Sequence, residues 1–130
     1  MPDTGNKKVL LVEDEQMLRE ICSMKLTKEG FNVVVALDGE EALKKVEEEM
    51  PDIVLLDIIL PNIDGFGVLE KIRAHTNERV AKVPVIMLTN LGQDEDVAKA
   101  RTLGANDYLV KAYFNPDEIS SKVKALLHID

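Results

Sequence analysis

Short apolar runs recur along the chain at regular intervals, and each contains about four residues and is rich in β-branched side chains. They lack the alternation of apolar and polar residues that marks a half-exposed strand. Such unbroken runs are typical of strands buried on both faces of a parallel sheet. The pattern predicts five strands, at residues 9–12, 33–35, 53–56, 85–88 and 108–110.

Segments with apolar residues at helical spacing follow these runs and predict five helices. Gly30, Pro51 and Gly104 come after three of the segments as stop signals, because glycine and proline commonly end helices. The predicted helical stripes are, in chain order, Leu18, Ile21, Cys22, Lys25 and Leu26; Ala42, Leu43, Val46 and Met50; Phe66, Leu69, Ile72 and Arg73; Val97, Ala98, Arg101 and Leu103; and Ile119, Val123, Leu126 and Leu127.

Strands that alternate with helices form repeated right-handed βαβ units. We therefore predict an α/β fold of the flavodoxin-like type, with a doubly wound five-stranded parallel sheet and five helices. A length of 130 residues suits one domain, and a hydrophobic content of 45% is enough for a buried core. We expect residues 1–6 to be a flexible leader and residues 7–128 to form the domain.

The charge balance and the cysteine count narrow the class of protein. The chain has 24 acidic and 16 basic residues, a net charge of -8 and no basic run, so we predict no direct binding to nucleic acid. No apolar stretch approaches the roughly 18 residues of a membrane span, and the first residues lack the order of a signal peptide. The single cysteine, Cys22, fits a reducing compartment. These features predict a soluble, cytoplasmic domain.

Charged and polar residues follow four of the predicted strands, at the edge of the sheet where ligands bind in such folds. Glu13 and Asp14 come directly after the first strand, Asp57 after the third, Thr89 after the fourth and Lys111 after the fifth. Taken alone, Asp14 is equally well explained as a helix N-cap. Asp57 is not, because no helix is predicted to start there and an unpaired buried carboxylate is costly. The conjunction of the five residues predicts a functional site.

Three carboxylates gathered at one edge repel one another unless a cation joins them or their pKa values rise. Such hard oxygen ligands suit Mg²⁺, which prefers a few carboxylates together with a phosphate. A carboxylate beside Mg²⁺ can act as a nucleophile and form an aspartyl phosphate. In that reaction Mg²⁺ and Lys111 would supply positive charge to the phosphoryl oxygens, and the Thr89 hydroxyl could donate a hydrogen bond to one of them.

Five short motifs that contain these residues follow one another in a specific order and spacing. They are Glu13-Asp14 after an apolar run, the strand 52–57 that ends at Asp57, the turn 60–65, the strand 84–89, and the segment 104–111 that ends at Lys111. Together they resemble the receiver domain of bacterial two-component response regulators, and the resemblance covers nearly the whole chain.

The resemblance implies a phosphorylation-controlled signalling switch whose phosphoacceptor is Asp57. A sensor histidine kinase or a phosphotransfer protein would donate the phosphoryl group from a phosphohistidine. Mg²⁺ would be held by Glu13, Asp14, Asp57 and the backbone carbonyl of Ile59. Lys111 would pair first with Asp57 and then with the phosphoryl group.

The resemblance also implies an output. Thr89 would move toward the phosphoryl group and Tyr108 would swing inward behind it, although Tyr108 is also explained as an ordinary packed aromatic residue. The changed surface would act on a downstream protein or a fused output domain, or form a phosphorylation-dependent homodimer. Such a domain phosphorylates itself and slowly loses the phosphoryl group, so it is not expected to be a turnover enzyme.

The sequence departs from the family pattern at several positions. Ala112 stands where proline is usual, and residues 112–116 are one residue longer than the common form. Asn115 is predicted to cap the last helix, with Pro116 at its first position. Asn90, which follows the switch threonine, is either a turn residue or a side chain that narrows the entry for the phosphodonor.

Ile59 and Leu91 lie two residues past Asp57 and Thr89 and flank the expected approach of a hydrolytic water. Polar side chains there could orient that water, whereas two apolar ones cannot and would exclude it. We therefore predict slow autodephosphorylation and a long-lived phosphorylated state.

Other functions compete with a switch. A magnesium-dependent small-molecule phosphatase or phosphotransferase could also work through an aspartyl phosphate. Enzymes of the haloacid dehalogenase type carry a second aspartate as general acid where this chain has Ile59. A nucleotide-binding module would need a glycine-rich loop after the first strand, where this chain has Glu13 and Asp14 instead. A degenerate receiver used only for protein contacts would not need the acids, Thr89 and Lys111.

Overall fold

The chain is built on one five-stranded parallel sheet, in a computed structural model that describes residues 7–89, 94–113 and 115–129. The strands are β1 (Lys8–Val12), β2 (Asn32–Ala36), β3 (Ile53–Asp57), β4 (Val85–Thr89) and β5 (Asp107–Val110). They lie in the order β2-β1-β3-β4-β5, and every neighbouring pair is parallel. This is a doubly wound order that reverses between β1 and β3, so the predicted fold class is confirmed.

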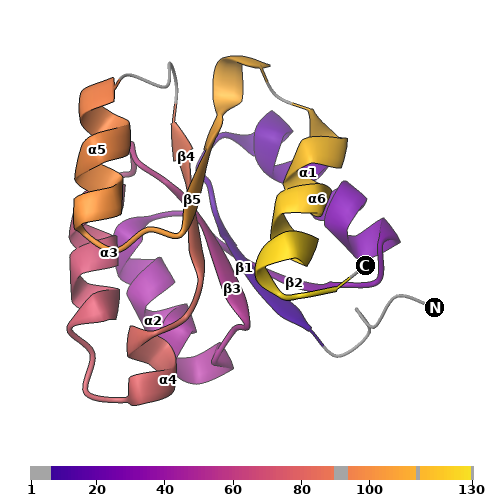
Figure 1. The fold of residues 1–130 in the computed structure, drawn as a ribbon. Helices are drawn as coiled ribbons and strands as arrows, with labels where there is room; N and C mark the ends of the chain where they lie inside the picture. The colour runs from indigo at the N-terminus through magenta and orange to yellow at the C-terminus, as the bar shows by residue number, and fades with distance from the viewer. Residues whose placement is uncertain (1–6, 90–93, 114, 130) are drawn as a thin grey trace.

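Helices connect the strands and cover both faces of the sheet. In the described residues they are α1 (Gln16–Lys28), α2 (Gly39–Glu49), α3 (Gly65–Arg73), α4 (Glu78–Ala81), α5 (Asp94–Thr102), the 3₁₀ helix η1 (Lys111–Tyr113) and α6 (Pro116–Leu126). Figure 1 shows α1 and α6 on one face and α2, α3 and α5 on the other. None of the helices described is both long enough and apolar enough to cross a membrane.

The sequence pattern predicts five helices, whereas the described residues contain six α-helices. The additional one, α4, is a single turn in which Asn77 Oδ1 accepts a hydrogen bond from the Arg79 amide at 2.9 Å. Val80 is its buried residue. A turn this short contains no repeating apolar stripe, which is why periodicity did not reveal it.

Two apolar cores fill the spaces between the sheet and its helices. β1, β3 and β4 are buried almost throughout, whereas β2 and β5 are partly exposed along most of their length. The prediction of burial on both faces is therefore right for the three central strands and wrong for the two outer ones. The outer strands lie at the edges of the sheet, where a neighbouring strand covers one side alone.

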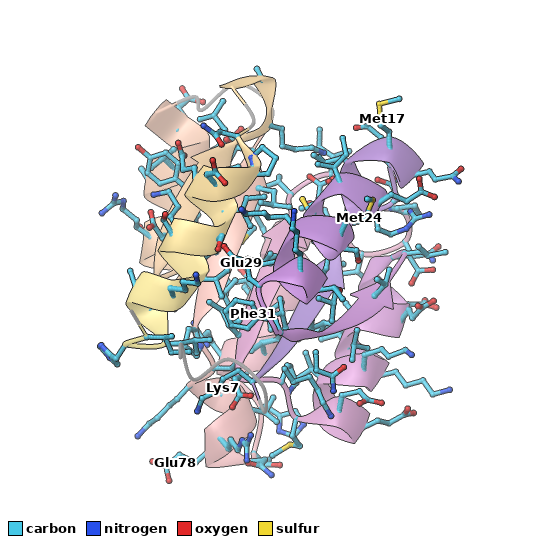
Figure 2. All side chains as sticks on the ribbon, turned by 90° about the vertical axis from the view of Figure 1, so that its right-hand side faces the viewer. Lys7, Met17, Met24, Glu29, Phe31 and Glu78 are labelled. Atoms are coloured by element: carbon cyan, nitrogen blue, oxygen red, sulfur yellow. The ribbon has the colours of Figure 1, made fainter. Side chains whose placement is uncertain are left out.

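Helix α1 carries more apolar residues than the core buries. Its buried residues are Leu18, Cys22 and Leu26. Ile21, from the same predicted stripe, is 39% exposed. Figure 2 shows Met17 and Met24 on the outer side of this helix, where they are 70% and 72% exposed. The apolar stripe of α1 therefore continues from the core onto the surface.

The predicted stripe of α5 is right at Leu103, which packs against the core, and wrong at two other positions. Ala100 is buried, whereas Ala98 and Arg101 are exposed. Alanine is common in both buried and exposed helix positions, so a helix rich in small residues gives an ambiguous periodic signal.

Arg73, at the end of α3, binds the loops that lead into β4 and β5. Its guanidinium donates hydrogen bonds to the carbonyls of Ala81, Val83 and Gly104 at 2.9, 2.7 and 2.8 Å, and to Asn106 Oδ1 at 3.0 Å. Helical spacing places Arg73 on the inner stripe, and these carbonyls explain why a charged residue is tolerated there.

The turn after β3 brings the start of α3 against the strand end that carries Asp57. The Gly65 amide donates to the Ile58 carbonyl at 2.7 Å, and a Cβ atom at Gly65 would lie 2.2 Å from the Asp57 carbonyl oxygen. This close approach of two backbone segments requires glycine. Asp64 Oδ1 accepts a hydrogen bond from the Gly67 amide at 2.9 Å and caps α3.

We expect Gly65→Ala to destabilise the domain by about 2 kcal/mol, because the added methyl group must displace the backbone at the end of β3. Gly67→Ala is a matched control in the same helix. Its Cβ would meet the Ile63 side chain, which can move, and alanine favours a helix over glycine by about 1 kcal/mol. Urea unfolding of the three proteins measures the difference. Equal stability of Gly65→Ala and the wild type would contradict the close approach.

Candidate functional site

Three carboxylates meet at the carboxyl edge of the sheet, where β1 and β3 end side by side. Val12 pairs with Leu56, so Glu13 and Asp57 are the next residues along adjacent strands. One carboxylate oxygen from each of Glu13, Asp14 and Asp57 lies within 4.8 Å of the others. Glu13 and Asp57 are 0% and 2% exposed, whereas Asp14 is exposed. The structure thus brings together the three acids that the sequence places after strands.

Lys111, the first residue after β5, supplies a cation to this edge. Its Nζ atom lies 2.9 Å from Glu13 Oε1 and 3.0 Å from Asp57 Oδ2. Burial of the side chain by itself favours the neutral amine, but the two carboxylates outweigh burial and raise the pKa of Lys111. Lys111 therefore stays charged between two acids.

The two oxygens of the Asp57 carboxylate have different partners. Oδ2 accepts a hydrogen bond from Lys111 Nζ at 3.0 Å, and Oδ1 accepts one from the Ile59 amide at 3.2 Å. The Ile59 side chain itself is 62% exposed. The lysine and the backbone of the following turn thus orient the carboxylate together.

Glu13 has one satisfied and one poorly satisfied oxygen. Oε2 accepts a hydrogen bond from the Glu15 amide at 3.0 Å. Oε1 is buried and, within the described residues, accepts no well-aligned hydrogen bond, although Lys111 Nζ is close. Burial raises the pKa of Glu13 to about 7, against the lowering effects of the Glu15 amide and of Lys111.

The donor set fits a hard divalent cation. All three acids offer oxygen ligands, the buried Oε1 of Glu13 lacks an aligned donor, and the exposed Asp14 leaves the site open to water. The N-cap of α1 is Glu15, so the alternative explanation of Asp14 as a helix cap is wrong. These residues could hold Mg²⁺.

Thr89 ends β4 and is 1% exposed. It pairs with Val110, the residue before Lys111, so it lies at the same edge of the sheet as the acids. Tyr108 is partly buried in β5, and the Arg101 guanidinium carbon lies 5.7 Å from the centre of its ring. Asn90 and Leu91, for which we predict roles at the entry and in hydrolysis, lie outside the described residues.

The segment after Lys111 forms η1, and the peptide bond before Ala112 is trans. Asn115 Oδ1 accepts a hydrogen bond from the Asp117 amide at 2.8 Å, and Pro116 is the first residue of α6. The predicted cap of the last helix is therefore confirmed.

A family model for the response regulator receiver domain matches residues 9–124. The chain belongs to this family. Receiver domains are phosphorylation-controlled signalling switches rather than classical enzymes, so the family sets the general function of the chain, as its sequence motifs predict.

Individual relatives agree with the family. The receiver domain is 46% identical over 121 residues to the transcriptional regulator ycf27 of Guillardia theta, and 40% identical over 122 residues to the alkaline phosphatase synthesis transcriptional regulatory protein PhoP of Bacillus subtilis. The alignments cover 93% and 94% of this chain but 45% and 49% of those proteins, so the chain spans about half the length of these curated relatives.

A solved structure shows the same fold. The chemotaxis protein CheY4 of Vibrio cholerae superimposes with a TM-score of 0.84 and 30% sequence identity, over 92% of this chain and 97% of that chain.

One residue near the site of the receiver domain was missed in the sequence. Arg19 Nη1 donates hydrogen bonds to the Glu13 and Asp14 carbonyls, both at 3.2 Å. Because every residue has a backbone carbonyl, a side chain that binds carbonyls cannot be recognised from the types of the residues around it. The available signal is a cation one turn inside a helix that follows two acids, a position where the helix dipole does not favour positive charge.

We predict that Glu13→Gln removes part of the pH dependence of stability of the metal-free receiver domain. The folded-state pKa of Glu13, about 7, lies above its ordinary value of 4.5, so the folded state binds the extra proton. The stability that this proton contributes is full below pH 4.5 and is lost as the pH rises through 7. Between these limits the wild type should lose up to about 3 kcal/mol relative to the variant.

Urea unfolding in EDTA at several pH values measures the free energy of unfolding of both proteins. Since all other titrating groups are shared, the difference between the two profiles isolates Glu13. Parallel profiles would show that Glu13 titrates as it does in an unfolded chain.

Proposed function

We propose that Asp57 is the phosphoacceptor of this receiver domain. The observation that supports the proposal most directly is the buried Asp57 carboxylate, 3.0 Å from Lys111 Nζ and grouped with two further acids. In the transfer, an Asp57 oxygen attacks the phosphorus of a phosphohistidine. The O–P bond forms, the P–N bond breaks, and the histidine nitrogen leaves with the electron pair. A sensor histidine kinase or a phosphotransfer protein is the proposed donor.

Glu13, Asp14, Asp57 and the backbone carbonyl of Ile59 are the proposed ligands of Mg²⁺. When bound, Mg²⁺ neutralises negative charge on the carboxylates and on the phosphoryl oxygens. Two of these ligands, Glu13 and Asp57, are buried and so are held in place by the surrounding protein. The exposed Asp14 gives the site access to solvent and to the donor. Mg²⁺ usually keeps several waters and binds one or two carboxylates with a phosphate, which agrees with such a half-open site.

Lys111 and Thr89 are the proposed stabilisers of the phosphoryl group. Lys111 is charged and already touches Asp57, so it can follow the negative charge from the carboxylate to the phosphoryl oxygens without moving far. Thr89 offers a hydroxyl donor at the end of β4. As switch residues, Thr89 would move toward the phosphoryl group and Tyr108 would turn inward, starting from its partly buried position beside Arg101.

A turnover phosphatase is the competing function, and Ile59 argues against it. The residue that would have to serve as general acid is apolar, its side chain is 62% exposed, and its amide is used to orient Asp57. We therefore propose that the domain catalyses its own phosphorylation and slow dephosphorylation, and does not turn over a small substrate.

The output is proposed to lie outside this segment. Two relatives named as transcriptional regulators are about twice as long as the aligned region. We propose that phosphorylation acts on a downstream protein or a fused output domain in the cytoplasm, and that any contact with DNA is made there. A phosphorylation-dependent homodimer stays a prediction, to be checked by elution volume with and without a phosphoryl mimic.

Incubation with a small acyl phosphate and Mg²⁺ should add one phosphoryl group to the wild-type protein, as measured by intact mass. Asp57→Asn removes the nucleophile and should abolish the adduct. Asp38→Asn is the matched control, because it removes a carboxylate after β2 and asparagine still caps α2. No adduct on the wild type, or an equal adduct on Asp57→Asn, would refute the proposal.

We expect Ile59→Asn combined with Leu91→Glu to accelerate loss of the phosphoryl group by about tenfold or more, because polar side chains can orient the hydrolytic water. The decay of the phosphorylated protein, followed by intact mass, measures the rate. Met24→Gln removes from α1 an apolar side chain about as exposed as that of Ile59, and should leave the decay unchanged. Equal or slower decay in the double variant would contradict the proposed role of Ile59 and Leu91.

A further inference from the structure

Arg19 lies one turn inside α1 and reaches back to the loop that carries two proposed metal ligands. A single nitrogen, Nη1, donates to both the Glu13 and the Asp14 carbonyl at 3.2 Å. The first turn of α1 contains no acidic residue, and the Glu15 side chain caps none of its amides. The helix itself therefore gives no reason for a cation at this end, and the contacts with the loop carbonyls account for it.

The position of the Asp14 carboxylate depends on the backbone of this loop. Before Asp14, the Glu13 amide donates to the Ala36 carbonyl at 3.1 Å; after it, the Glu15 amide donates to Glu13 Oε2 at 3.0 Å. Among the described residues, no hydrogen bond or ion pair holds the Asp14 carboxylate itself. Its carbonyl is bound by Arg19, so the guanidinium is the group that fixes this residue between two anchored neighbours.

We propose that Arg19 is a positioning residue for the metal site. By fixing the carbonyls of Glu13 and Asp14 it holds the exposed Asp14 carboxylate toward Asp57, so that the three acids stay within reach of one hard divalent cation. The inference rests on the proposed magnesium site and extends it to a residue that supplies no ligand. Groups that orient metal ligands in this way commonly change metal affinity by about tenfold or more.

The charge of Arg19, considered without its hydrogen bonds, would weaken Mg²⁺ binding rather than support it. A guanidinium beside a cation site repels the cation, so removing the charge should tighten Mg²⁺ binding if Arg19 acted only through its field. Removing the hydrogen bonds should weaken binding, because Asp14 would no longer be held. The sign of the change in affinity therefore separates positioning from simple electrostatics.

The decisive variant is Arg19→Gln, with Mg²⁺ binding measured by calorimetry. We expect its Kd for Mg²⁺ to rise about tenfold. Lys28→Gln is the matched control, because it removes one exposed positive charge from the same helix, about 14 Å further along the axis. It should leave the Kd unchanged. As a second readout, the Mg²⁺ concentration for half-maximal labelling by an acyl phosphate should rise with the Kd, whereas the rate at saturating Mg²⁺ should not fall.

An unchanged or lower Kd in Arg19→Gln would overturn the proposal. Unfolding in EDTA checks that the variant is folded; if it is not, Arg19→Lys, which keeps the charge but whose nitrogen lies one bond closer to the backbone than Nη1, is judged by the same criterion. A wild-type protein that binds no Mg²⁺ and accepts no phosphoryl group would instead refute the proposed function. Normal labelling of the wild type with no effect at Arg19 would refute the positioning role alone.

Discussion

The ammonium group of Lys111, placed between Glu13 and Asp57, is the interaction on which the site depends. Both carboxylates are almost fully buried, and an ionised group taken out of water carries a desolvation cost of several kcal/mol. Lys111 lies 2.9 and 3.0 Å from the two acids and offsets much of that cost. One positive charge cannot neutralise two negative ones, however, and burial raises the pKa of Glu13 to about 7 in spite of the lysine. The three acids and one lysine leave this edge of the sheet short of positive charge, which favours binding of a further cation.

The parallel sheet is what makes this arrangement possible. Lys111 follows β5, and β4 separates β5 from β3 in the sheet. The Lys111 and Asp57 side chains together bridge two strand spacings, about 10 Å between backbones, and the long unbranched lysine is suited to that distance. Thr89 ends β4, the strand between β3 and β5, so the topology that brings the ammonium to Asp57 also places a hydroxyl residue at the same edge of the sheet.

Much of the fold and of the site could be predicted because both are recorded in local patterns. Unbroken apolar runs revealed the five strands, and the residue types at or directly after the ends of β1, β3 and β5 marked Glu13, Asp57 and Lys111. Short or small-residue elements were harder: α4 has one buried residue, and the register of α5 depends on which alanine faces the core. Arg19 left only a weak signal in the sequence, because its partners are backbone carbonyls, which every residue has.

The partly buried position of Tyr108 has an optical consequence. The chain contains two tyrosines, Tyr108 and Tyr113, and no tryptophan. Both tyrosines are within two or three residues of Lys111 in sequence, and the ring of Tyr108 has a guanidinium 5.7 Å from its centre. Tyrosine emission from the intact domain therefore originates in a single short segment around the lysine. The molecule contains its own spectroscopic reporter for that segment, free of any tryptophan background and needing no attached dye.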